Sequence, residues 1–429
     1  MKKVLIISPH FPPVNAPDMQ RLRQSLPYFL ENNWQAEVIA VDSDFIEINS
    51  IDELLLETIP STIKVHSIKA FKVASTRKYG LGSLSMRSYF HFKKKGNELL
   101  AKSKFDLIFF STTAFHVMAL GPYWKKKFKI PFIVDIQDPW RNDFYLDKPK
   151  NERPPKFLIS YNIDKYLEAK TIPKADGILS VSDGYIDVFK NRYSNIGNIP
   201  TLTLPFAGNK LDFDFIKKVK TLSKNILFDN VKKNVVYIGR GGNDLKKSLS
   251  ILFDALKEIK ITNFDFFSTL HFWFIGTSYA EIGKGIKTIY PVAKKFGVEE
   301  IVTEITDRLP YFETLYWLKQ ADLLFVPGST DTAYTASKIY SYILADKPLL
   351  AIFHKNSSVV KILKETNCGY CLTFDDFENS TYLISECRRN LNFILCQSEI
   401  RKTNWDEFDK YSAKNMTKIM ISFFDIIVK

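Results

Sequence analysis

Short apolar runs separated by helix-length amphipathic segments occur in two series along this chain of 429 residues. The first series opens with an apolar run at 4–7, helical spacing over 19–32 and a second apolar run at 36–41. A strand, a helix and a strand within about 40 residues are typical of a parallel crossover unit. The alternation resumes after residue 230. Because one core rarely extends beyond about 250–300 residues, the sequence predicts two α/β domains with parallel sheets.

The remaining elements of the two series follow from the same periodicities. In the first series we expect strands at 63–68, 107–111, 132–136 and 177–181, and helices at 87–102, 115–127, 157–171 and 184–192. In the second we expect strands at 235–238, 270–275, 302–304, 323–326 and 349–353, and helices at 247–259, 280–296, 311–320 and 337–345. These elements give domains at 1–205 and 231–404, a linker at 206–230 and a last amphipathic helix within 405–429.

Composition restricts the class of protein. The chain is 45% hydrophobic and 25% charged, which is ordinary for a soluble globular protein. No apolar run approaches the roughly 20 residues that a membrane-spanning helix needs, and the run at 4–7 is too short for an export signal. The four cysteines, at 368, 371, 387 and 396, lack the spacing of metal ligands. We therefore expect a cytoplasmic protein without a bound metal or cofactor.

The net charge is +13, and part of it lies in the basic, aromatic segment 77–95. Such a segment suits peripheral contact with an anionic membrane surface, and it suits a solvated helix face equally well. No helix-turn-helix or stacking-aromatic signature accompanies the charge, so nucleic acid is not an expected partner.

Two loops of the second series combine glycines with cations or hydroxyls at expected strand ends. Gly239 and Arg240 follow the strand at 235–238, with Lys246 at the next helix start, and Gly276 and Thr277 follow the strand at 270–275. Glycines allow a ligand to approach the backbone closely, and arginine and lysine can hold a diphosphate.

A third loop, 328–338, joins the apolar run at 323–326 to a helix start. Helix starts present unpaired backbone N–H groups, and here Ser337 and Lys338 would add a cap and a positive charge. An ordinary capped helix would explain these two residues alone. Three such loops on one edge of a sheet, however, indicate a site for a nucleotide diphosphate.

Four segments resemble motifs of the GT-B glycosyltransferases, and especially of the family-4-like group that uses nucleotide-sugar donors. They are Phe11-Pro12-Pro13 with Arg21, the stretch from Ile130 to Trp140, Tyr237–Arg240 with a following lysine, and the stretch from Thr335 to Pro348. The resemblance implies two Rossmann-like domains facing a central cleft, with the C-terminal helix crossing back to the N-terminal domain. It also implies metal-independent, retaining transfer of a hexose in the synthesis of a polysaccharide or another glycan.

The resemblance assigns roles to individual residues. The donor would be bound by Gly239, Arg240, Lys246, Gly276, Thr277, Tyr311, Thr335, Ser337 and Lys338, with Tyr311 bordering the nucleobase. The saccharide or lipid-linked acceptor would contact Asn15, Arg21 and Trp140, and the chemistry would involve Asp138, His116 and Asp331, with His10 as a further candidate. Asp138 would alternatively cap a turn, and Trp140 and Tyr311 would alternatively be core residues.

Two departures from the group leave the reaction open. Ser341 and Ala333 stand where the group has glutamates that hold the donor ribose and sugar. A nucleotide-sugar epimerase or hydrolase, and a non-catalytic partner that binds nucleotide sugars, therefore remain alternatives to a transferase.

Overall fold

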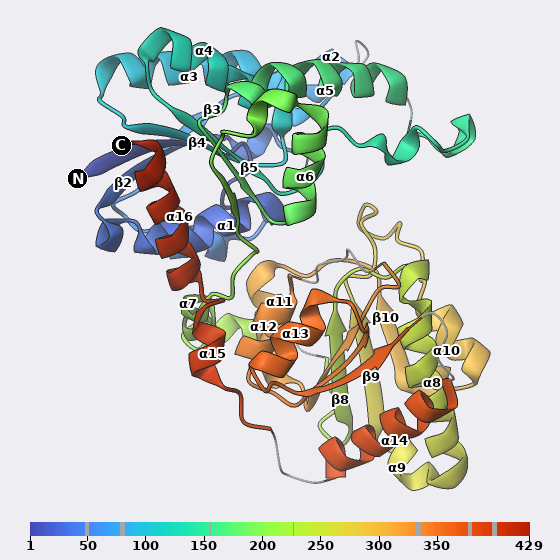
Figure 1. The fold of residues 1–429 in the computed structure, drawn as a ribbon. Helices are drawn as coiled ribbons and strands as arrows, with labels where there is room; N and C mark the ends of the chain where they lie inside the picture. The colour runs from blue at the N-terminus through green and yellow to red at the C-terminus, as the bar shows by residue number, and fades with distance from the viewer. Residues whose placement is uncertain are drawn as a thin grey trace. The chain divides into compact units, whose positions relative to one another are not determined.

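A computed structural model describes residues 1–47, 51–77, 82–154, 156–225, 227–331, 337–375, 380–396 and 401–429. The chain forms two compact units. The first comprises Met1–Ala207 together with Ala413–Lys429, and the second is Gly208–Ser412. Both are α/β units, as the sequence predicts (Figure 1).

The first unit is built on a parallel sheet in the order β3-β2-β1-β4-β5-β6-β7. Its strands are β1 (Lys2–Ile7), β2 (Trp34–Val41), β3 (Lys64–Ile68), β4 (Leu107–Ser111), β5 (Phe132–Ile136), β6 (Gly177–Ser180) and β7 (Thr201–Thr203). The central strands are buried on both faces, which explains their uninterrupted apolar sequences. The strand order reverses between β1 and β4, and sheets of this kind bind ligands beyond the carboxyl ends of the strands at such a point.

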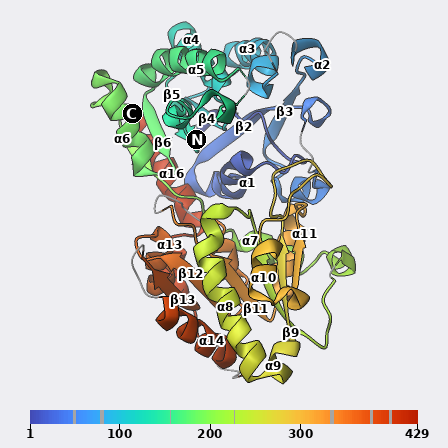
Figure 2. The ribbon, with the colours of Figure 1, turned by 90° about the vertical axis from the view of Figure 1, so that its right-hand side faces the viewer.

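Helices cover both faces of this sheet. They are α1 (Gln20–Ser25), α2 (Val73–Thr76), α3 (Leu84–Lys102), α4 (Leu120–Phe128), α5 (Phe157–Thr171), α6 (Asp183–Arg192) and α16 (Ala413–Ile427). The helices α3, α4 and α5 form a layer on one face, and α1 and α16 lie on the other (Figure 1, Figure 2). The α16 side chain Phe424 packs edge-on against Trp34, with ring centroids 5.6 Å apart. The C-terminal helix thus returns to the first unit, as expected.

The second unit has a parallel sheet in the order β10-β9-β8-β11-β12-β13. Its strands are β8 (Lys233–Ile238), β9 (Leu270–Ile275), β10 (Val302–Ile305), β11 (Leu323–Pro327), β12 (Leu349–His354) and β13 (Tyr370–Phe374). Its helices are α7 (Lys210–Ile216), α8 (Lys246–Thr262), α9 (Phe264–Ser268), α10 (Tyr290–Phe296), α11 (Tyr311–Gln320), α12 (Ile339–Leu344), α13 (Ser358–Glu365), α14 (Ser380–Cys396) and α15 (Trp405–Asp409). Here the strand order reverses between β8 and β11.

Several expected helices are shorter in the structure. The helix expected at 19–32 ends as an α-helix at Ser25, because Pro27 has no N–H to donate and its ring crowds the preceding turn. Of the helix expected at 280–296, only α10 (Tyr290–Phe296) is helical. The residues before it, which include Gly283 and Gly285, form no helix. The helix expected at 405–428 is divided into α15 and α16. The expected linker at 206–230 contains α7 of the second unit, and β7, just before it, pairs with β6.

Candidate functional site

The three loops singled out in the sequence lie on one edge of the second sheet. The strands β8 and β11 are neighbours at the point where the strand order reverses, and β9 lies beside β8. All three are parallel, so the loops that follow them start at the same edge. The backbone ties two of these loops together, because Gly241 N donates to Thr277 O over 2.8 Å.

Lys338 is held against the end of β8. Its Nζ donates to the Tyr237 hydroxyl over 2.9 Å and lies 4.7 Å from the centre of the Tyr237 ring. The same hydroxyl donates to Arg240 O over 2.8 Å. A β-carbon at Gly239 would overlap Lys338 Nζ, the end of a flexible side chain, so glycine here lets the Lys338 ammonium lie directly against the end of β8.

Three cations meet at this edge. Burial, together with the positive charges of Arg240 and Arg308, lowers the pKa of Lys338 to about 7. The Arg240 guanidinium pairs with both carboxylate oxygens of Asp244, over 2.8 and 2.6 Å, and this hydrogen bonding lowers the pKa of Asp244. An anion placed among the cations would favour the charged form of Lys338. The arrangement is therefore suited to bind a phosphate or diphosphate.

The structure alters the expected role of Ser337. The helix α12 begins at Ile339, its N-cap residue is Lys338, and no side chain caps it. The prediction that Ser337 caps a helix start is therefore wrong. Thr335 and Ala333 lie outside the described residues. Asp331 is exposed, and its N–H donates to Ser329 Oγ over 3.0 Å.

Other predicted donor residues have roles within the unit. Thr277 Oγ1 donates over 2.8 Å to the buried Glu304. The Tyr311 hydroxyl donates to Asp212 Oδ2 of α7 over 2.8 Å. Gly276 has a φ of 71°, which favours glycine, and Lys246 is exposed at the first residue of α8. The structure holds no ligand, so a role for any of these four in donor binding stays a prediction.

The first unit has a polar cluster at the reversal point of its own sheet, after β1 and β4. His10 Nδ1 lies 3.0 Å from both carboxylate oxygens of Asp18. Asp18 is buried and also accepts from Thr112 Oγ1 over 2.9 Å and from Thr113 N over 3.0 Å. Burial acts to raise the pKa of Asp18, but the hydrogen bond and charge of His10 and the Thr112 and Thr113 contacts lower it overall. Asp18 therefore fixes the orientation of the His10 ring.

Asp138 follows β5 on the same edge and is exposed. Partial removal of its carboxyl from water and the negative charge of Asp18 raise its pKa. A carboxylate with a raised pKa is a candidate for accepting a proton from a hydroxyl. Sequence reasoning included Asp138 and His10 but missed Asp18, because its partners at 112 and 113 come from a distant part of the chain.

His116 and Trp140 are packed inside the first unit. His116 Nδ1 lies 2.6 Å from Ser85 Oγ, and His116 Nε2 lies 2.9 Å from Asp164 Oδ1, so both ring nitrogens are used. Trp140 is 4% exposed and stacks on Phe115 with ring centroids 5.6 Å apart. The structure therefore favours the core alternative for Trp140, and it argues against a sugar contact by His116.

Arg21 is also buried. Its Nε lies 3.0 Å from Asp135 Oδ2, and its terminal nitrogens donate to Leu204 O over 2.6 Å and to Pro205 O over 3.2 Å. Burial lowers the pKa of Arg21, opposed by the charge of Asp135. These contacts argue against the predicted contact between Arg21 and a donor phosphate or acceptor. Asn15 is half-buried and accepts from Gln20 Nε2 over 3.4 Å.

No group of three or more histidine, cysteine or acidic side chains in the described part of the chain is placed to hold a metal ion. Within the same residues, no helix is long and apolar enough to cross a membrane.

No protein-family model matches the chain, and no curated protein matches it by sequence. Among solved structures, it is similar to Anabaena Alr3699/HepE in complex with UDP and glucose, with 14% identity, a TM-score of 0.59, and 99% of this chain and 100% of that chain covered. It is similar to the UDP-forming α,α-trehalose-phosphate synthase of Burkholderia xenovorans with glucose-6-phosphate, with 10% identity, a TM-score of 0.59 and full coverage of both chains (100% each). It is also similar to the N-terminal domain of Candida albicans trehalose-6-phosphate phosphatase, with 13% identity, a TM-score of 0.59, and 100% and 97% covered. The first two are two-domain GT-B proteins, and the chain shares their fold.

Proposed function

We propose that the chain is a glycosyltransferase that moves a hexose from a nucleotide-diphosphate sugar to a saccharide or lipid-linked acceptor. The observation that carries this proposal is the position of Lys338 against the end of β8, beside Gly239 and Tyr237, where the charges of Arg240 and Arg308 also act on its ammonium. The solved structures of Anabaena Alr3699/HepE with UDP and with UDP-glucose lend support, because they place such a ligand in a protein of this fold.

In this proposal, the second unit binds the donor and stabilises the departing diphosphate. Lys338 and Arg240 would face the negative charge that develops on the phosphate as the bond to the sugar breaks, so no metal ion is required. Fixed cations of this kind need no rearrangement during the reaction. Retention of configuration at the anomeric carbon, which the family resemblance implies, belongs to the proposal.

The first unit would hold the acceptor at the edge that carries His10, Asp18 and Asp138. The Asp18 carboxylate directs one ring nitrogen of His10 toward itself, so Nε2 is the nitrogen that can contact an acceptor hydroxyl. Asp138 offers a second acceptor for a hydroxyl hydrogen. We place the reaction in the cytoplasm, in the synthesis of a cell-surface polysaccharide or another glycan.

The proposal is tested by thermal unfolding of the full chain with a panel of UDP, GDP, ADP, TDP and CMP sugars. A sugar nucleotide that binds the folded state raises the unfolding temperature, and the size of the shift reports its affinity. We expect one nucleotide class to stabilise the wild-type protein and to have little effect on Lys338→Ala. The matched control is Lys294→Ala, an exposed lysine of α10, which should behave as wild type. If no sugar nucleotide binds the wild-type protein, the proposal is wrong.

Ser341 favours a second candidate function, that of a non-catalytic nucleotide-sugar-binding protein. It is the third residue of α12, half-buried, and it supplies only a short hydroxyl where the resembling group has a carboxylate. This candidate predicts binding in the thermal panel but no sugar transfer to any acceptor. An epimerase or hydrolase would instead release or convert the nucleotide sugar with no acceptor present.

A further inference from the structure

The helix α5 exposes a face that is both apolar and positively charged. Its exposed side chains include Leu158, Ile159, Lys165, Tyr166 and Lys170. The helix has two acidic residues, and both are turned to partners within the unit. Asp164 Oδ1 lies 2.9 Å from His116 Nε2, and the buried Glu168 pairs with Arg192 over 3.0 Å. A solvated helix face normally mixes both charge signs, so this one is unusual.

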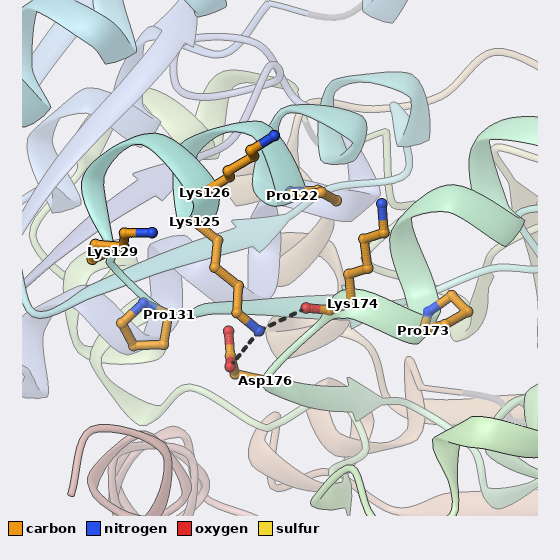
Figure 3. A pocket seen from close by; sticks show the side chains of 8 residues that line it. All are labelled: Pro122, Lys125, Lys126, Lys129, Pro131, Pro173, Lys174 and Asp176. Atoms are coloured by element: carbon orange, nitrogen blue, oxygen red, sulfur yellow. Dashed lines mark hydrogen bonds and ion pairs between the residues drawn. The ribbon is translucent and has the colours of Figure 1, made fainter.

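The neighbouring helix α4 extends the positive surface. It carries no acidic residue, and Lys126 and Lys127 are exposed in its last turn. Lys125 does not add to this surface, because its Nζ forms an ion pair with Asp176 Oδ1 over 2.7 Å. Lys126 points away from that pair (Figure 3). A hollow of about 700 Å³ beside these residues is lined by two more lysines, Lys129 and Lys174. It lies where β5 and β6 begin, at the edge opposite the acceptor residues.

The third helix, α3, contributes Phe90, which is 65% exposed, and the exposed Lys94. Other basic residues of the segment 77–95 do not contribute. Arg87 is buried and donates to Phe71 O over 2.7 Å, and Arg77 pairs with Glu47 over 3.4 Å. The residues at 78–81 lie outside the described part of the chain. In the segment 77–95, which the sequence suggested for membrane contact, Arg77 and Arg87 are therefore engaged by other groups of the first unit.

The three helices form one layer, since α4 packs against both α3 and α5 (Figure 1, Figure 2). We propose that the outer surface of this layer docks on an anionic lipid bilayer. Lysines attract acidic headgroups, and the exposed Phe90, Leu158 and Ile159 can enter the boundary between headgroups and acyl chains. The only exposed acidic side chain of the three helices is Glu98 of α3, and it pairs with Lys95 over 3.4 Å and with Lys102 over 3.1 Å. An acidic protein partner would use the lysines but would leave these apolar side chains without a role.

This inference goes beyond the proposed function and does not depend on catalysis. The test is co-sedimentation of the full chain with phosphatidylcholine vesicles, with and without phosphatidylglycerol. We expect binding only to vesicles that contain phosphatidylglycerol, and weaker binding in 1 M salt, where the screening length falls to about 3 Å.

Two double variants test the charged and the apolar side chains of the surface separately. Lys126→Gln with Lys127→Gln should weaken vesicle binding at least about tenfold. Leu158→Ser with Ile159→Ser should also weaken it several-fold. The matched controls lie in the second unit. They are Lys294→Gln with Lys295→Gln, adjacent exposed lysines in the last turn of α10, and Ile261→Ser, whose side chain is 75% exposed.

The proposal is overturned if the wild-type protein does not bind the anionic vesicles. It is also overturned if the control variants lose as much binding as the surface variants, because general attraction by the net charge would then be sufficient. If only the lysine variant loses binding and the Leu158 and Ile159 variant does not, insertion of apolar side chains is refuted. All four variants alter exposed residues, and unchanged thermal unfolding would verify that each is folded.

Discussion

Raising the pH from 6 to 8 should weaken the binding of the proposed nucleotide-sugar donor about tenfold. The reason is the state of Lys338, whose pKa is lowered to about 7 by burial and by the charges of Arg240 and Arg308. The charged form is then populated to about 90% at pH 6 and to about 10% at pH 8. If the diphosphate binds only the charged form, its affinity follows these fractions. The loss corresponds to about 1.4 kcal/mol of binding free energy.

The assay is a calorimetric titration, at several pH values between 6 and 8, with the nucleotide sugar that stabilises the protein in the thermal panel. The diphosphate of a nucleoside-diphosphate sugar does not titrate in this range, so a change in affinity reports on the protein. Lys338→Ala should bind weakly at every pH and should lose the pH dependence. Lys294→Ala, on an exposed surface, should keep both the affinity and the pH dependence of the wild type. A dissociation constant that is flat from pH 6 to 8 in the wild type, or an unchanged slope in Lys338→Ala, would refute the reasoning.

Three further changes have definite expected outcomes. Gly239→Ala would displace the Lys338 ammonium from the end of β8, so titration with the nucleotide sugar should show at least about tenfold weaker binding. Asp18→Asn removes the charged partner of His10 and should cost about 3 kcal/mol at pH 7. Because the pKa of Asp18 is lowered from 3.8 on folding, its contribution is complete above that value and is lost as the pH falls below it, so wild type and variant should converge in acid denaturation. His116→Ala should lower the free energy of unfolding by about 2 kcal/mol yet leave the affinity for the nucleotide sugar unchanged, because His116 is hydrogen-bonded inside the first unit.

Sequence reasoning located the central strands because their chemistry is local. The run Val4 to Ile7 is apolar throughout, and the structure buries all four residues. The loop after β8 was recognised for the same reason, since glycine and arginine directly follow an apolar run. The ends of the helices were predicted less accurately. Pro27 carries the information that ends α1, but the apolar spacing beyond it continues and suggests a longer helix.

The site predictions that the structure disfavours, those for His116 and Arg21, have a different cause. Whether His116 or Arg21 faces a ligand depends on partners that are far away in the sequence. His116 is held by Ser85 and by Asp164, 31 and 48 residues distant, and Arg21 lies against Asp135. A single sequence shows that these side chains can bind sugars or phosphates. It cannot show that these side chains are already hydrogen-bonded or paired with other side chains of the same unit.

The return of α16 to the first unit affects the order in which the chain can fold. Phe424 packs against Phe109 and Trp34, and Asp425 accepts from Lys2 Nζ over 2.8 Å and from Trp34 Nε1 over 3.1 Å. Those contacts cannot form on the ribosome until residues 208–412 have been made. The second unit can then be complete while the part of the first sheet that α16 covers is still exposed, a reversal of the usual N-terminal-first order. During synthesis, that uncovered face is the surface that a chaperone would have to protect.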